Sequence, residues 1–170
     1  MARDTRPDFD TYFMGIALAV RARADCLGMK VGAVIAVERR VVSTGYNGTP
    51  AGMKNCTEGG CYRCRERDKY GPGEAYDRCI CVHAEQNSLM MAARLGIPVG
   101  GGVVYTTTKP CFTCLKETVQ SGIQKIVYLH EWRHPDPDLE PQYSLLEASV
   151  PEGVTRLEME DPQAEGAQAR

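Results

Sequence analysis

The sequence has 170 residues, a length that suits one domain with a core of its own. Its apolar content of 43% is ordinary for a globular protein, and its formal net charge of −2 argues against a general nucleic-acid-binding surface. The longest apolar run covers only residues 15–20, and the N-terminus does not have the layout of a signal peptide, so we expect a cytoplasmic protein with no membrane partner. Eight cysteines are many for such a chain, and in the cytoplasm they are expected to be reduced and available to metal or catalysis.

The apolar pattern predicts an α/β protein. Helical spacing from Asp8 predicts a first helix that ends near Gly28, and two β-rich runs then predict a hairpin over 31–37 and 40–44. A long polar loop follows and reaches residue 77. Beyond it we expect helices at 83–96, 111–121 and 143–148 and strands at 103–107, 125–129 and 154–159. This order predicts one domain over residues 8–160, with a mixed sheet of about five strands and helices on both faces. Residues 161–170 lack apolar side chains and are expected to form a disordered tail.

Two short motifs predict a catalytic zinc site. His83-Ala84-Glu85 and Pro110-Cys111-Phe112-Thr113-Cys114 both lie at predicted helix N-termini. Cys111 and Cys114 share one helix face, and the positive end of that helix favours the thiolate form that zinc needs. Three protein ligands leave the fourth tetrahedral position open, as in catalytic zinc sites. Glu85 follows His83 closely enough to reach that position without being a ligand. A lone His or a lone Cys-x-x-Cys is more often structural, but the two motifs together in this order are the signature of zinc nucleobase deaminases.

Several further segments resemble the deoxycytidylate (dCMP) deaminase family. They are residues 30–35, 43–52, 55–56, 81–87, 105–107, 110–114 and 120–123. The segment Gly45-Tyr46-Asn47-Gly48 is the more specific one, because other zinc deaminases share the zinc motif. The resemblance covers roughly residues 8–132. It implies a cytidine-deaminase-like three-layer sandwich that hydrolyses dCMP to dUMP and ammonia and thereby supplies dUMP for thymidylate synthesis.

The resemblance also implies roles for individual residues. His83, Cys111 and Cys114 would hold the catalytic zinc, and Glu85 would be the proton shuttle. Asn47 would face the deoxyribose, and the backbone of Ala84 would lie near the base. Many family members are homohexamers that dCTP with Mg²⁺ activates and dTTP inhibits, and the region Gly45, Tyr46, Asn47 and Gly48 helps to form that regulatory site. Among the basic residues near the motifs, Lys30 is our first choice for the 5′-phosphate.

Six further cysteines remain: Cys26, Cys56, Cys61, Cys64, Cys79 and Cys81. Free cysteines are often small buried hydrophobic residues, but most of these flank a polar loop that has no apolar core. Related deaminases carry a second, structural zinc on cysteines that match Cys26 and Cys56. We therefore expect a second zinc held by four of these six, which would stabilise the loop. The spacing does not decide which four.

Three alternatives concern the function. The chain could deaminate another cytosine nucleotide or nucleoside, because Glu131-Trp132-Arg133 stands where the family often has a Tyr, near the expected substrate wall. It could deaminate a base in tRNA or single-stranded DNA, but an isoelectric point of about 5.9 argues against the basic groove that such enzymes need. It could be a regulatory or DNA-uptake protein with a vestigial site, but Glu85 then has no evident structural purpose.

Overall fold

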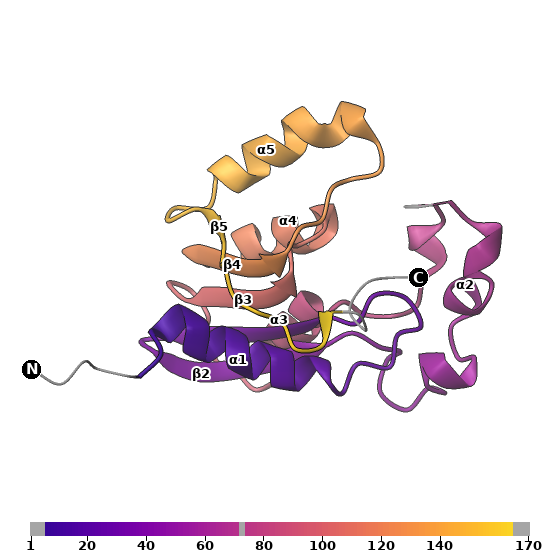
Figure 1. Cartoon of the computed structure of the whole chain (residues 1–170), viewed down its shortest axis with the longest axis horizontal. Helices are drawn as coiled ribbons and strands as arrows, with labels where there is room; N and C mark the ends of the chain where they lie inside the picture. The colour runs from indigo at the N-terminus through magenta and orange to yellow at the C-terminus, as the bar shows by residue number, and fades with distance from the viewer. Residues whose placement is uncertain (1–5, 72–73, 165–170) are drawn as a thin grey trace, which may run out of the picture.

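A five-stranded mixed sheet forms the centre of the computed structural model, which describes residues 6–71 and 74–164 (Figure 1). The strands lie in the order β2-β1-β3-β4-β5. β1 is antiparallel to both of its neighbours, whereas β3, β4 and β5 are parallel. Their bounds are β1 Gly32–Val37, β2 Arg40–Tyr46, β3 Val103–Thr108, β4 Lys125–His130 and β5 Val154–Arg156. The prediction of a mixed sheet with one opening hairpin is confirmed.

Helices cover both faces of this sheet, as the sequence predicts. The α-helices are α1 Phe9–Arg21, α2 Tyr62–Arg65, α3 Ala84–Arg94, α4 Phe112–Gln120 and α5 Glu140–Ala148. Phe13, Met14 and Ala17 of α1 pack with Val34 and Tyr105 on one face. The opposite face packs against side chains from α3, α4 and α5, which include Leu89, Leu115 and Tyr143. Short 3-10 turns occupy Cys56–Glu58, Arg67–Lys69, Tyr76–Arg78 and Pro137–Leu139. Among the described residues, we find no helix of the length and apolar character that a membrane span requires.

Two local features bring α3 and the sheet together. Glu38 and Arg39 have φ angles of 49° and 60°, so a tight two-residue turn joins β1 to β2. Near the other end of β2, Gly45 lies directly under α3, since a Cβ atom there would be 2.2 Å from the Ala84 carbonyl oxygen. Only glycine therefore permits this approach. The N-terminus of α3 is thereby held against the end of β2.

Several boundaries differ from the sequence-based prediction: the last strand, predicted over 154–159, is only Val154–Arg156, and the helix predicted at 143–148 begins at Glu140. Two differences have a clear cause in the contacts. The first helix ends at Arg21 and not near Gly28, because the N–H groups of residues 22–24 bond to carbonyls three residues back and the Asp25 N–H bonds to the Asn47 carbonyl outside the helix. The turn lets Asp25 accept a hydrogen bond from the Cys56 backbone N–H. Asp161 in turn belongs to the folded part of the chain: its carboxylate receives two 2.7 Å bonds from Arg21 and is only 2% exposed. The rest of the tail, residues 165–170, lies outside the described residues.

Candidate metal centres and active site

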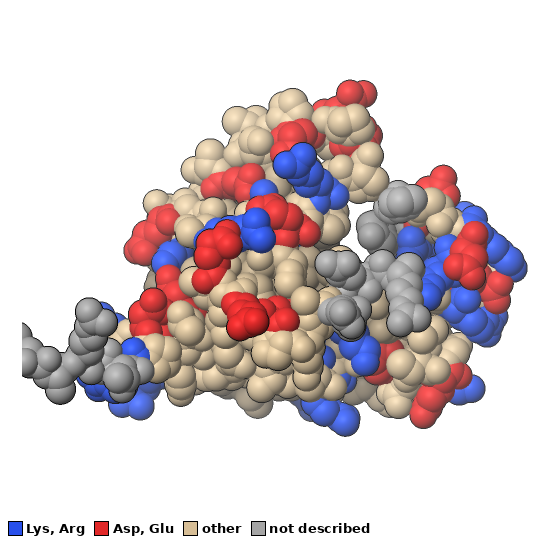
Figure 2. Space-filling view, in the orientation of Figure 1, with Lys and Arg blue, Asp and Glu red and all other residues tan. Residues whose placement is uncertain are grey.

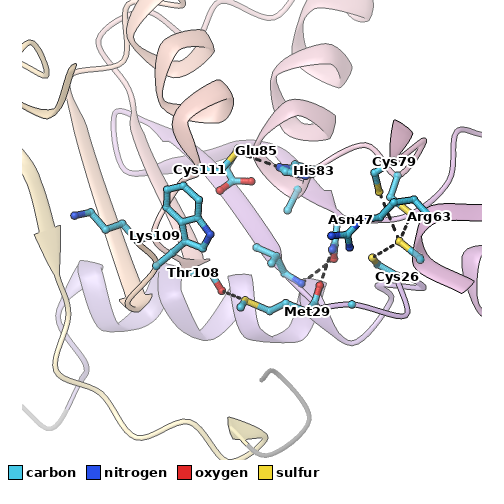
Figure 3. Close-up of a pocket in the computed structure, with 16 residues that line it drawn as sticks. Cys26, Met29, Asn47, Arg63, Cys79, His83, Glu85, Thr108, Lys109 and Cys111 are labelled. Atoms are coloured by element: carbon cyan, nitrogen blue, oxygen red, sulfur yellow. Dashed lines mark hydrogen bonds between the residues drawn. The ribbon is translucent and has the colours of Figure 1, made fainter. Parts of the chain in front are cut away.

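The three predicted zinc ligands meet at two helix N-termini, and Figure 3 shows two of them, His83 and Cys111. His83 precedes α3 and Cys111 precedes α4, and Cys114 lies one turn further along α4. The Nδ1 atom of His83 is 3.4 Å from the Sγ atoms of both cysteines. Nitrogen and sulfur ligands of one tetrahedral zinc lie about 3.6 Å apart, given metal–ligand bonds of about 2.0 and 2.3 Å. The three side chains therefore fit a zinc ion with one open position.

The electrostatics of these residues suit a metal site. Hydrogen bonding from the Cys114 thiol, and then the neighbouring His83, lowers the pKa of Cys111 to about 4. Cys111 is thus ready to bind a cation as a thiolate. Glu85 is only 4% exposed, and burial raises the pKa of its carboxyl group above the usual range. The nearest hydroxyl is that of Thr106, whose Oγ1 lies 3.4 Å from the Glu85 Oε1 atom.

A single hollow contains this centre and most of the predicted substrate residues. Asn47, Ala84 and Glu85 line it together with His83 and Cys111. Lys30 is exposed and does not line the hollow, so the structure does not bring it to the site. The cations that do line it are Arg63 and Lys109, and Trp132 adds an aromatic wall. Sequence analysis placed Trp132 near the expected substrate wall, but it gave Arg63 no role.

The Gly-Tyr-Asn-Gly segment shapes one wall of the hollow. The Asn47 side chain accepts a 2.8 Å bond from the Val31 N–H and donates a 2.7 Å bond to the Met29 carbonyl. Gly48 pairs with Val82 through two backbone hydrogen bonds. Asn47 therefore fixes the 29–31 segment, and Gly48 connects the hairpin to the residue just before His83.

Tyr143 of α5 supports the turn that carries the cysteine ligands. Its buried hydroxyl donates a 2.6 Å hydrogen bond to the Pro110 carbonyl. The neighbouring Lys109 forms a 2.8 Å ion pair with Glu147 of the same helix. Sequence analysis missed both contacts, because nothing in the local pattern of α5 indicates which distant carbonyl its tyrosine reaches.

A separate lobe between β2 and α3 contains five of the other six cysteines, and Cys26 joins them from the segment between α1 and β1. Among the described residues between 51 and 80, only Cys56, Cys61 and Cys64 are buried. The six sulfurs form a cluster of free cysteines, with neighbouring Sγ atoms 3.6–3.9 Å apart. Disulfide sulfurs lie about 2.05 Å apart, so these cysteines are not crosslinked. Three small side chains are too little apolar surface to order some thirty residues, so this lobe needs another source of stability.

Two sets of four cysteines have the spacing of metal ligands. Cys26, Cys56, Cys64 and Cys81 have sulfurs within 4.8 Å of one another, and so do Cys61, Cys64, Cys79 and Cys81. The sulfurs of a tetrahedral zinc with four thiolates lie about 3.8 Å apart. The observed distances fit that value. Cys26, Cys64, Cys79 and Cys81 also border the hollow that contains His83, so the two sites are neighbours.

Comparisons with known proteins agree with this geometry. A relative from Mycobacterium phage D29, a deoxycytidylate deaminase, is 42% identical over 135 residues, which cover 75% of this chain and 98% of the relative. The deoxycytidylate deaminase of Schizosaccharomyces pombe is 42% identical over 72% of this chain, which spans only 37% of that protein's length. The chain likewise spans 41% of the Saccharomyces cerevisiae deoxycytidylate deaminase.

Similarity in three dimensions extends over nearly the whole chain. The crystal structure of a dCMP deaminase from the cyanophage S-TIM5 in complex with dCMP and dUMP superposes with a TM-score of 0.67 at 25% identity, and the match covers 90% of this chain and 99% of that one. A model of the family described as the cytidine and deoxycytidylate deaminase zinc-binding region matches residues 7–130. With its zinc-binding motifs folded into one centre, this chain belongs to the cytidine and deoxycytidylate deaminase family.

Proposed function

We propose that this chain is a zinc-dependent dCMP deaminase, a hydrolase that converts dCMP to dUMP and ammonia and so supplies dUMP for thymidylate synthesis. The observation that carries the proposal is that His83 and Cys111 line one hollow with the buried carboxylate of Glu85, while the buried Cys114 sulfur lies 3.4 Å from the same His83 nitrogen. The phage relatives support the choice of substrate, because one is a deoxycytidylate deaminase and the other was crystallised with dCMP and dUMP. We assign the activity to a deaminase domain over residues 8–160 and place the enzyme in the cytoplasm, where free thiols persist.

Glu85 is suited to move protons in this reaction. A zinc ion held by three protein ligands supplies Lewis-acid activation of water as the nucleophile. Among the described residues that line the hollow, Glu85 is the only carboxylate. We assign it the transfer of the first water proton to N3 of the pyrimidine and of the second to the amino group on C4. The C4–N bond then breaks, ammonia leaves, and the water oxygen stays on C4 as the carbonyl.

The other residues of the hollow suit a nucleotide. Trp132 offers an aromatic surface to the base, and the Ala84 backbone lies beside Glu85. We propose Arg63, with Lys109, for the 5′-phosphate, because both line the hollow while Lys30 does not. Guanidinium groups bind phosphates through two parallel hydrogen bonds. Asn47 contributes by fixing the 29–31 segment and faces the sugar from that wall.

A second, structural zinc in the lobe is part of this proposal. Four of the six clustered cysteines have the ligand number, the burial and the spacing that such a site requires. Closed four-thiolate sites stabilise segments that lack a hydrophobic core, which is the condition of residues 51–80. We assign this zinc the task of holding the lobe beside the active site.

Nucleotide regulation and assembly into a homohexamer also belong to the proposal. A second hollow beside the Gly45–Gly48 region is lined by Asp25, Tyr46 and Asn55. In the described part of the chain, the buried Oδ1 atom of Asp25 has no hydrogen-bond partner, which suits a Mg²⁺ ion with dCTP or the inhibitor dTTP. Assembly is supported by the exposed apolar side chains near the end of α3, namely Met90, Met91 and Leu95. Activity with and without dCTP plus Mg²⁺, and light scattering of the purified protein, test these two assignments.

The decisive experiment is turnover of matched substrates by the purified protein, followed by ultraviolet absorbance. We expect deamination of dCMP and much slower reaction of dCTP, of cytidine and of a tRNA anticodon stem. Deamination of another cytosine nucleotide or nucleoside with dCMP untouched would replace the substrate assignment. Deamination of the tRNA stem alone would favour the nucleic-acid alternative, and no turnover of any substrate by zinc-loaded protein would reject the enzyme.

A further inference from the structure

The sulfurs of the six clustered cysteines lie so close together that a single metal ion cannot bind all of them. One zinc ion takes four thiolates. If it occupied the set that contains Cys26 and Cys56, then Cys61 and Cys79 would remain as thiols in van der Waals contact, with their sulfurs 3.8 Å apart. If it occupied the other set, Cys26 and Cys56 would remain, although Cys56 is fully buried and Cys26 is 8% exposed. Either choice leaves two buried or half-buried ligands unused.

Ligand counting points to two ions that share sulfurs. Two separate tetrahedral zinc ions need eight thiolates, but the cluster has six cysteines, so two of them must bind both ions. The two sets of four overlap in Cys64 and Cys81 and in no other residue. These two sulfurs are 3.9 Å apart, close to the length of one edge of a zinc–thiolate tetrahedron. The two overlapping sets of four sulfurs therefore share one edge, the Cys64–Cys81 pair, as two tetrahedra joined along an edge would.

The contacts of Cys64 identify it as a central ligand. Its sulfur lies 3.9 Å from Cys26, which belongs only to the first set, and 3.6 Å from Cys79, which belongs only to the second. A sulfur that belongs to only one set would contact the unshared sulfurs of that set alone. Cys64 lies in α2, the α-helix among the described residues of the lobe, and this helix places its sulfur between the two sets.

The surroundings of the cluster suit an anionic metal centre. Two Zn²⁺ ions with six thiolates carry a net charge of −2. The Leu27 N–H donates a 3.4 Å hydrogen bond to the Cys56 sulfur, and Arg63 lines the hollow beside Cys64 and Cys79. Figure 2 shows Lys and Arg side chains intermixed with Asp and Glu side chains over the lobe that contains α2, so the nearby Arg63 and the Leu27 N–H matter more than the overall charge of the lobe. Positive groups and N–H donors stabilise thiolates against protonation.

We propose that the six cysteines hold a binuclear zinc cluster in which the sulfurs of Cys64 and Cys81 each bridge both ions. Cys26 and Cys56 complete the coordination of one ion, and Cys61 and Cys79 complete that of the other. The proposal deepens the structural zinc assigned above and rests on it, but it does not depend on the identity of the substrate. It predicts three zinc ions in each chain, one for catalysis and two in the cluster.

Metal counting separates this proposal from the simpler one. The full chain is loaded with zinc, freed of unbound metal and measured by native mass spectrometry and elemental analysis. We expect three ions in the wild-type chain and two in His83→Ala, which lacks only a catalytic ligand. One ion in His83→Ala would refute the binuclear cluster but keep the single structural zinc, and none would refute both. Iron with acid-labile sulfide in the cluster would also overturn the proposal.

Cadmium NMR tests the bridging sulfurs directly. The zinc ions are replaced by ¹¹³Cd in the wild-type chain and in His83→Ala. We expect two cluster signals that split one another through the shared sulfurs, and a third, unsplit signal that disappears in His83→Ala. Two cluster signals without mutual splitting, or a single cluster signal, would refute the bridges.

Two matched variants place the bridge at a named residue. Cys79→Ala removes an outer ligand, so one cluster ion should remain on the set that contains Cys26. Cys64→Ala removes a shared ligand, so both cluster ions should be lost or weakened in a chelator titration. Equal metal retention by the two variants would contradict the role of Cys64. The wild-type metal count and spectrum stand independently if either variant fails to fold.

Discussion

Substitution of Glu85 by glutamine separates the proposed role of this side chain in proton transfer from its role in the fold. The amide has the same size as the carboxylate but acts as neither an acid nor a base at neutral pH. Glu85 is only 4% exposed, so solvent water does not replace it readily as a proton carrier. Loss of a positioned general acid–base lowers kcat by about 10²- to 10⁴-fold, which corresponds to about 3–5 kcal/mol in the activation barrier. We expect Glu85→Gln to lose that much activity.

The same variant should keep its fold and its metal. Burial raises the pKa of the Glu85 carboxyl group, which means that the ionised form is disfavoured in the folded state. A neutral amide avoids that cost, so the free energy of unfolding should change by no more than about 1 kcal/mol. Since His83, Cys111 and Cys114 supply the ligands, the zinc content should equal that of the wild type.

Three measurements check this prediction: kcat for dCMP by ultraviolet absorbance, zinc by elemental analysis and stability by urea unfolding. Glu58→Gln, the same change at an exposed residue of the lobe, serves as the control and should match the wild type in all three. A Glu85→Gln variant that binds zinc and keeps kcat within about tenfold of the wild type would disprove the shuttle role. Loss of zinc from this variant would instead make Glu85 a ligand or a support of the ligands.

Three further predictions concern residues around the site. Arg63→Gln should lower kcat/KM for dCMP by about 10- to 100-fold. The kcat/KM for deoxycytidine, which has no phosphate, should not change. An equal loss for both substrates, or the same loss in the exposed Arg65→Gln control, would contradict phosphate binding by Arg63. Tyr143→Phe should lower the free energy of unfolding in urea by about 1–2 kcal/mol, because the buried Pro110 carbonyl loses its donor; an unchanged midpoint would show that another donor replaces it. Arg21 holds the pKa of Asp161 well below its ordinary value of about 3.8. A carboxyl group whose pKa is lower in the folded state than in the unfolded state stabilises the fold at pH values above its unfolded pKa. The free energy of unfolding should therefore fall as the pH drops below about 4. Asp161→Asn should be about 3 kcal/mol less stable at pH 7, and its stability should fall less steeply with pH.

The elements predicted correctly are those whose signal is local. The periodicity of the first helix and the two β-rich runs depends on side-chain alternation within a few residues, and the zinc motifs are short segments at helix starts. The end of α1 was not predictable, because the Asp25 N–H leaves the helix and bonds to the Asn47 carbonyl in a distant segment. The pairing of Arg21 with Asp161 explains why Asp161 is folded although its neighbours lack apolar side chains.

Site residues were missed where their position depends on a distant part of the chain. Arg63 reaches the hollow because the cysteine cluster folds the lobe back toward His83. Lys30 looked suitable because it lies beside a motif in sequence, but its side chain is exposed outside the hollow. Sequence spacing likewise did not show which of the six cysteines lie together, because their positions depend on how a loop without regular periodicity folds.

The position of the cysteine cluster explains how a polar lobe can determine the geometry of a catalytic centre. Cys81 ends the lobe and His83 immediately precedes α3, so only Val82 separates a proposed cluster ligand from a proposed catalytic ligand. Val82 is fixed by two backbone hydrogen bonds to Gly48, and the neighbouring Asn47 fixes the opposite wall of the hollow. A metal ion on Cys81 therefore restrains the same short segment that the hairpin restrains. Since displacement of a catalytic group by about 1 Å can cost two orders of magnitude in rate, we expect the proposed lobe metal to support catalysis without contacting the substrate.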